Sequence, residues 1–182
     1  MTRIILVYGV LAGLIVAVPM FLLIANAEPG SASTSHVTGY LIMLLALSLV
    51  FLGVKRLRDR ELGGAIRFVP ALLAGLGISA VAGVIYVVGW EITLALTDFA
   101  FIDSYSTAAV EAARAKGASA AEIEALVVQM ESFREQYMNP LIRLPMTFIE
   151  IFPVGCLVSV IAAALLRNSR FLPATTARPP AA

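Results

Sequence analysis

Four long apolar stretches, separated by polar segments, limit what this chain can fold into. They cover residues 4–25, 37–54, 68–96 and 141–166, and each approaches or exceeds the roughly 20 residues that an α-helix needs to cross a bilayer. Hydrophobic residues make up 60% of the chain and charged residues 14%, whereas soluble domains carry about 25% charged residues. The chain therefore has too little polar surface for a water-soluble globule. We predict an all-α fold, a four-helix transmembrane bundle.

The first apolar stretch shares features with a secretion signal, because Arg3 precedes it and Ala25-Asn26-Ala27 ends it. Its length of about 22 residues exceeds the roughly 7–15 apolar residues of a signal peptide. We therefore expect this stretch to be retained as the first span.

Basic residues are concentrated on one side of a four-span arrangement. That side carries only two acids, Asp59 and Glu61, but most of the Lys and Arg residues, namely Arg3, Lys55, Arg56, Arg58, Arg60, Arg67, Arg167, Arg170 and Arg178. The positive-inside rule places this side, and with it both termini, in the cytoplasm. Residues 1–167 are predicted to form a single membrane domain, and the proline-rich residues 168–182 a disordered cytoplasmic tail.

A polar segment with helical signals lies between the third and fourth apolar stretches. Asp103 or Ser104 can cap a first helix that ends at Lys116-Gly117, and Ser119 and Glu122 have the spacing of a capping box. In the second helix, apolar residues recur at helical spacing, at Ile123, Leu126, Val127, Met130, Phe133 and Tyr137. We predict an extracytoplasmic helical hairpin over residues 103–139. Its apolar face packs within the protein or, as the alternative, binds a protein partner.

Small residues recur at every fourth position in three of the predicted spans. Such faces allow close approach of helix backbones in a membrane. They predict helix packing inside the bundle or, alternatively, a homodimer face. The residues are Gly9, Gly13, Gly75, Ser79, Gly83, Gly155 and Ser159.

Glu150 lies within the fourth apolar stretch, where a carboxylate is costly and needs a protein or water partner. Counting about 1.5 Å per residue from the basic ends of the spans brings Thr38, Tyr40 and Tyr86 to a similar depth. We predict a polar site of these four residues inside the membrane. It is either a hydrogen-bonded glutamate that fixes helix register, or a proton, cation or lipid-headgroup site.

The same count places Glu91 and Arg143 at equal distance, about 36 Å, from the basic ends Arg67 and Arg167. That distance lies just beyond a hydrocarbon core of about 30 Å. The two residues are therefore predicted to form an interfacial ion pair.

Residues for other chemistry are scarce. The single histidine and the single cysteine, Cys156, are far apart in sequence and cannot form a usual zinc site. Motifs for phosphate loops, metalloproteases and serine hydrolases are missing from the sequence. We predict no metal, no cofactor and no nucleic-acid partner, and Cys156 in its apolar surroundings is expected to be an inert thiol.

Several segments together resemble the bacterial multi-pass membrane family known as domain of unknown function 4199. The matching segments include Lys55-Arg56-x-Arg58-Asp59-x-Glu61-Leu62-Gly63-Gly64, Gly89-Trp90-Glu91 and Glu150-Ile-Phe-Pro153-Val-Gly155. The resemblance implies a multi-pass inner-membrane protein whose activity is not established, and it supplies no catalytic residue.

These observations predict a non-catalytic structural, assembly or interaction protein that is embedded in the lipid bilayer of the bacterial inner membrane. A small transporter or channel subunit that uses Glu150 is the alternative, and a membrane enzyme that acts on lipids is a third hypothesis.

Overall fold

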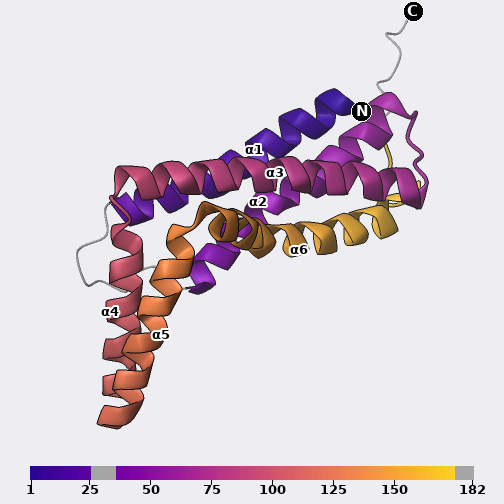
Figure 1. The fold of residues 1–182 in the computed structure, drawn as a ribbon. Coiled ribbons are helices and arrows are strands. Elements are labelled where there is room, and N and C mark those ends of the chain that lie inside the picture. The colour runs from indigo at the N-terminus through magenta and orange to yellow at the C-terminus, as the bar shows by residue number, and fades with distance from the viewer. Residues whose placement is uncertain (26–35, 175–182) are drawn as a thin grey trace, which may run out of the picture.

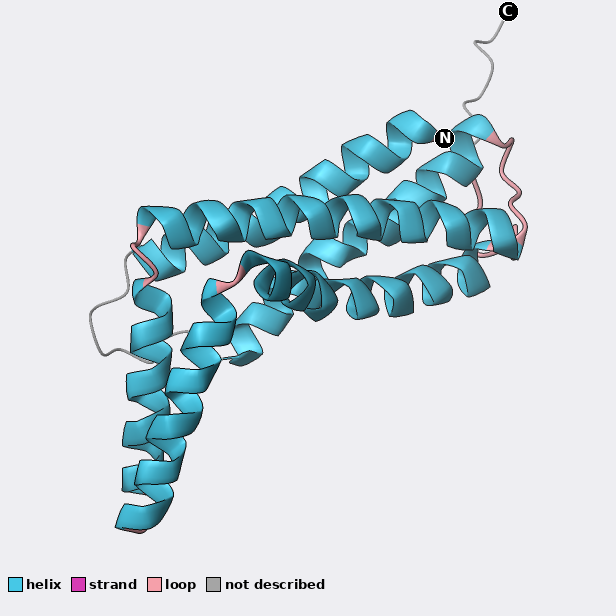
Figure 2. Ribbon diagram, viewed as in Figure 1, coloured by secondary structure: helices cyan, strands magenta, loops and turns pink. Residues whose placement is uncertain are grey.

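The computed structural model describes residues 1–25 and 36–174, with the side chains of residues 36–38 outside the described part. This part is all helical, as predicted, and contains no strand (Figure 2). The elements are α1 Thr2–Ala25, α2 His36–Arg56, the π-helical turn η1 Leu57–Glu61, α3 Phe68–Leu96, α4 Ala100–Ala115, α5 Ala120–Met138 and α6 Pro140–Leu166. Four of the helices, α1, α2, α3 and α6, are long and apolar enough to cross a membrane, which confirms the four predicted spans.

The four spans form a ring in which α3 packs on α1 and α6, and α2 packs on the same two helices from the other side, with less contact between α2 and α3. Figure 1 shows α1, α3 and α6 running alongside one another, whereas α4 and α5 leave this direction and cross it steeply. The hairpin of α4 and α5 is joined to the spans mainly through α6 and the turn after α3. The molecule is therefore a bundle of spans with an arm at one end.

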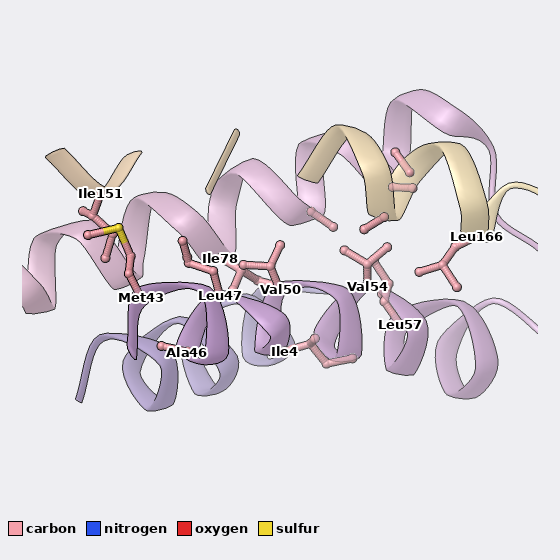
Figure 3. Close-up of a cluster of buried hydrophobic side chains, with 14 of the residues drawn as sticks. Ile4, Met43, Ala46, Leu47, Val50, Val54, Leu57, Ile78, Ile151 and Leu166 are labelled. Atoms are coloured by element: carbon pink, nitrogen blue, oxygen red, sulfur yellow. The ribbon is translucent and has the colours of Figure 1, made fainter. Parts of the chain in front are cut away.

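A buried apolar cluster runs along the centre of the bundle (Figure 3). Its members come from all four spans and include Ile4, Leu47, Val50, Ile78, Ile151 and Leu166. Many large apolar side chains point outward instead, for example Leu45, which is 69% exposed, and Ile149, which is 64% exposed. An apolar exterior is unstable in water, so this surface supports a membrane environment.

Small residues make the close contacts between spans. A Cβ atom on Gly13 of α1 would lie 2.5 Å from the Ile85 Cβ and 2.9 Å from the Ala82 carbonyl oxygen of α3. The predicted small-residue faces therefore pack inside the bundle.

The crossing of α3 and α6 also contains a pair of serines. Ser79 and Ser159 meet with their hydroxyl oxygens 3.2 Å apart, and each hydroxyl also donates to the carbonyl four residues earlier, that of Gly75 or Gly155. These bonds satisfy both hydroxyls in the apolar interior.

The hairpin follows most of the predicted capping signals. Ser119 and Glu122 form the complete capping box at the start of α5. Gly117, with φ of +80°, ends α4, and the amides of Gly117 and Ala118 donate to the carbonyls of Arg114 and Ala113. This pattern is a Schellman motif, in which glycine adopts the left-handed conformation at low cost.

The predicted start of the first hairpin helix near Asp103 is wrong. Helix α4 begins at Ala100, and its N-cap Phe99 has a left-handed φ of +59° and no side-chain capping bond. The hairpin helices therefore cover 100–138 rather than 103–139. This start coincides with ring contacts of Phe99 and not with a capping side chain.

The predicted disorder of residues 168–182 is also corrected, for residues 168–174. Phe171 packs against the core cluster, with its ring edge-on to Phe51 at a centroid distance of 6.4 Å. The carbonyls of Phe171 and Leu172 accept hydrogen bonds from the buried Arg58. Residues 175–182 lie outside the described part, as do residues 26–35.

Candidate functional site

The base of the hairpin contains the most extensive polar cluster of the described residues. Arg143, near the start of α6, donates from Nε to one carboxylate oxygen of Glu91 at 2.7 Å and from Nη2 to the other at 2.6 Å. Its Nη1 donates to the carbonyl of Tyr137 at 2.8 Å, at the end of α5. The structure thus brings Glu91 and Arg143 together in a two-pronged ion pair, and the arginine also binds the end of the hairpin.

Only 5% of Arg143 is exposed. The residue is therefore buried more deeply than was predicted for a member of an interfacial ion pair. Its guanidinium carbon lies 5.2 Å from the centroid of the Phe99 ring and 5.9 Å from that of Tyr137. Cation–π contacts of this kind contribute more when the cation is shielded from water.

The backbone before Phe99 is strained, because Asp98 and Phe99 have consecutive left-handed φ values of +47° and +59°. Such conformations cost about 1–3 kcal/mol for residues other than glycine. The strain places the Phe99 ring among Trp90, Leu94 and Ile102, which pack together at this end of the bundle. Ring packing and the contact with Arg143 offset the backbone cost.

Trp90 and Tyr137 join the third span to the end of α5. The indole Nε1 of Trp90 donates to the Tyr137 hydroxyl oxygen at 2.7 Å, and both side chains are buried. Burial raises the pKa of the Tyr137 phenol above its ordinary value, so the phenol stays neutral at physiological pH. We name the cluster of Trp90, Glu91, Phe99, Tyr137 and Arg143 the hairpin base.

The predicted site around Glu150 is assembled only in part. The Tyr86 hydroxyl, which is buried, donates to Glu150 over a long distance of 3.4 Å, whereas Glu150 itself is exposed on the surface of α6. Tyr40 is 54% exposed. The Thr38 side chain lies outside the described part. Glu150 therefore lies on the outer side of the bundle rather than along a central path.

The sequence of the chain matches a known protein family. A family model described as "Protein of unknown function (DUF4199)" matches residues 7–168. The chain belongs to this family. No curated protein and no solved structure matches it.

The sequence did not single out Arg58 as a buried residue. In this DUF4199 chain its side chain is fully buried, and it donates to the Asp59 carboxylate at 2.6 Å and to the carbonyl of Phe171 at 2.9 Å. It also donates to the carbonyl of Leu172 at 2.5 Å. The partners of Arg58 at Phe171 and Leu172 lie beyond the residues matched by the family model. We name the contact of Arg58 with residues 171–172 the tail latch.

Across residues 1–25 and 36–174, no group of three or more His, Cys, Asp or Glu residues could hold a metal ion. The single cysteine, Cys156, is half-buried on α6. Within the described part, the ionisable side chains that contact one another are mainly those of the ion pairs at the two ends of the spans.

Proposed function

We propose that this DUF4199 chain is a non-catalytic protein of the bacterial inner membrane that presents its α4–α5 hairpin to a protein partner on the outer side. In this proposal both ends of the chain lie in the cytoplasm. The charge asymmetry of the sequence supports the orientation, because the end of the bundle that carries Arg56, Arg60 and Arg67 is strongly basic.

One observation carries the proposal: the hairpin is held firmly at its base and leaves the bundle as a free arm (Figure 1). The hairpin base fixes the end of α5 to both α3 and α6 through Trp90 and Arg143. Beyond that base, α4 and α5 pack on one another: the ring centroids of Tyr105 and Phe133 lie 6.0 Å apart, and Arg134 of α5 pairs with Asp103 of α4. A rigid, self-supported arm is suited to binding because little ordering is needed when a partner docks.

The chemistry of the arm indicates the kind of partner. The arm carries six acids, Asp103, Glu111, Glu122, Glu124, Glu131 and Glu135, against three basic residues, Arg114, Lys116 and Arg134. Val127 is 48% exposed and Val128 is 66% exposed on its surface. A complementary partner would offer a basic surface around an apolar contact.

Site-specific photocrosslinking in cells tests this function. A photoreactive residue at Val128 is expected to form a protein adduct of defined mass, and the double reversal Glu124→Lys with Glu131→Lys should abolish that adduct. The same photoreactive residue at Leu157, which is 60% exposed on α6, serves as the control that faces lipid. An adduct that survives the charge reversal, or no protein adduct at Val128, contradicts the proposal.

A subunit that handles protons or cations is the second candidate, and the contact between Tyr86 and Glu150 inside the spans favours it. Since Glu150 is exposed on the bundle surface, such a path would form only between copies of the chain. The test measures proton flux into proteoliposomes. This role is supported if Glu150→Gln abolishes the flux and Glu124→Gln leaves it intact. Equal flux in protein-free vesicles rules it out.

A further inference from the structure

The end of the bundle that carries Met1, the loop after α2 and the end of α6 is rich in arginine (Figure 1). We propose that these arginines form a binding collar for the phosphate groups of anionic phospholipids in the surrounding leaflet. The collar consists of six exposed residues, Arg3, Arg56, Arg60, Arg67, Arg167 and Arg170.

The acids at this end are already paired with other cations. Asp59 accepts from Lys55 and from Arg58, and Glu61 pairs with the amino terminus at Met1. Within residues 1–25 and 36–174, none of the six collar arginines forms an ion pair with a carboxylate of the protein. The collar therefore keeps its charge available for an external anion.

The collar lies at the height of lipid headgroups. Leu52 lies one helical turn before Arg56 and is 47% exposed, and Val7 lies one turn after Arg3 and is 46% exposed. Residues four positions apart lie on the same face of a helix. The guanidinium groups thus lie at the ends of helix faces that the lipid acyl chains cover. At that height in the bilayer, the neighbouring lipid groups are the phosphates.

The type of cation also favours phosphate. The six collar residues are all arginines, whose planar guanidinium can donate two parallel hydrogen bonds to a phosphate group. A juxtamembrane cluster of this size is typical of sites that attract anionic lipids. Phosphatidylglycerol offers that phosphate with a net negative charge, whereas the choline group of phosphatidylcholine cancels it.

Lipid titration of the purified full-length chain in neutral detergent tests the collar. Native mass spectrometry would count bound phosphatidylglycerol and phosphatidylcholine with identical acyl chains, and thermal unfolding would report the stabilisation by each lipid. The wild type is expected to retain phosphatidylglycerol preferentially. The double variant Arg56→Gln with Arg60→Gln should bind it about fivefold more weakly for each arginine removed.

The control variant removes equal charge from the tip of the hairpin, with Arg114→Gln and Lys116→Gln, and should bind like the wild type. Arg56→Lys with Arg60→Lys keeps the charge but loses the paired guanidinium hydrogen bonds, so it should bind phosphatidylglycerol more weakly than the wild type and more tightly than the Gln variant. This variant also tests the collar if the Gln variant fails to fold. Equal lipid preference in the Arg56/Arg60 Gln variant and the wild type would overturn the proposal. So would displacement of the lipid by inorganic phosphate, which would identify a soluble phosphate as the ligand.

Discussion

At the scale of single residues, two buried arginines have the same arrangement of partners at opposite ends of the spans. Each donates to one carboxylate and to two backbone carbonyls: Arg143 binds the end of α5, and Arg58 binds residues 171–172, which follow α6. A buried guanidinium is tolerated only when all its donors are paired, because desolvation of the charge is costly. Each arginine therefore makes the stability of the bundle depend on a neighbouring segment.

The pair of Glu91 and Arg143 gives the first prediction. Glu91→Gln should lower the free energy of unfolding by about 1.5–3 kcal/mol, since it removes charged hydrogen bonds from a buried guanidinium. The double variant Glu91→Gln with Arg143→Gln should cost less than the sum of the two single variants. Unfolding in detergent of the wild type, the two single variants and the double variant completes this double-mutant cycle. Strictly additive losses would show that the two side chains act independently.

The tail latch gives the second prediction. Deletion of residues 168–182 removes two carbonyl acceptors of Arg58, and we expect a loss of about 2 kcal/mol, the usual cost of leaving a buried polar group unpaired. Deletion of residues 175–182 alone spares the latch and serves as the control. Adding Arg58→Gln to the longer deletion should recover part of the loss. Equal thermal stability of the two deletions would contradict the latch.

At the scale of elements, the sequence predicts what depends on local chemistry. The capping box at Ser119 and the glycine turn at Gly117 were expected from their residue types, and the structure contains both. The start of α4 was not predictable in this way, because Phe99 adopts a left-handed conformation for the sake of its ring contacts. The latch was equally hidden, since Arg58 binds backbone carbonyls that have no sequence signature.

The contact of α1 with α3 gives the third prediction. Gly13→Ala should destabilise the protein by about 1–3 kcal/mol, because the new methyl group would meet the backbone carbonyl of Ala82 at 2.9 Å and cannot be relieved by a rotamer change. Gly39→Ala in α2 is the matched control, since nothing lies within 4 Å of its Cβ position. Thermal unfolding should show a loss for Gly13→Ala and no loss for Gly39→Ala. Identical midpoints would refute the close approach of the two spans.

The capping box gives the fourth prediction. Hydrogen bonds from the Ser119 amide and hydroxyl lower the pKa of Glu122 below its ordinary value of 4.5. A lowered folded-state pKa stabilises the hairpin fully above pH 4.5, and this contribution is lost as the pH falls through the lower folded value. Amide protection of the first turn of α5, with exchange rates corrected for their intrinsic pH dependence, should therefore show a downward step below pH 4.5 in the wild type. In Glu122→Gln the exchange should lack this step; a wild type without the step would contradict the bond.

At the scale of the whole molecule, the bundle has small residues between its helices and many large apolar side chains outside. Hydropathy alone therefore located the spans but did not show which face of each span points inward. The facing partners, such as Ser79 against Ser159 and Gly13 against Ile85, depend on how the four helices pair. The same limit applies to Glu150, whose exposed position on α6 could not be read from its depth.

The orientation across the membrane gives the fifth prediction. In a Cys156→Ser background, a membrane-impermeant thiol reagent added to sealed cells should label Val128→Cys on the hairpin and spare Arg60→Cys. Arg60 is suited to this test because it is exposed, whereas a cysteine at the buried Arg58 would resist labelling on either side. Labelling of Arg60→Cys from outside would show that the orientation is the opposite of the one proposed.

The distance along the chain between the partners in the hairpin base has a consequence for biosynthesis. Glu91 precedes Arg143 by 52 residues, which a ribosome adds in about 3–10 s at 5–20 residues per second. Throughout that interval the third span has been made, but Arg143, the cation that pairs with Glu91, has not. The earlier spans can already pair through Gly9 and Gly13, while α6 arrives last and brings both Arg143 and the facing Ser159. The newborn protein therefore passes through a three-span stage in which the carboxylate of Glu91 lacks the cation that binds it in the folded chain.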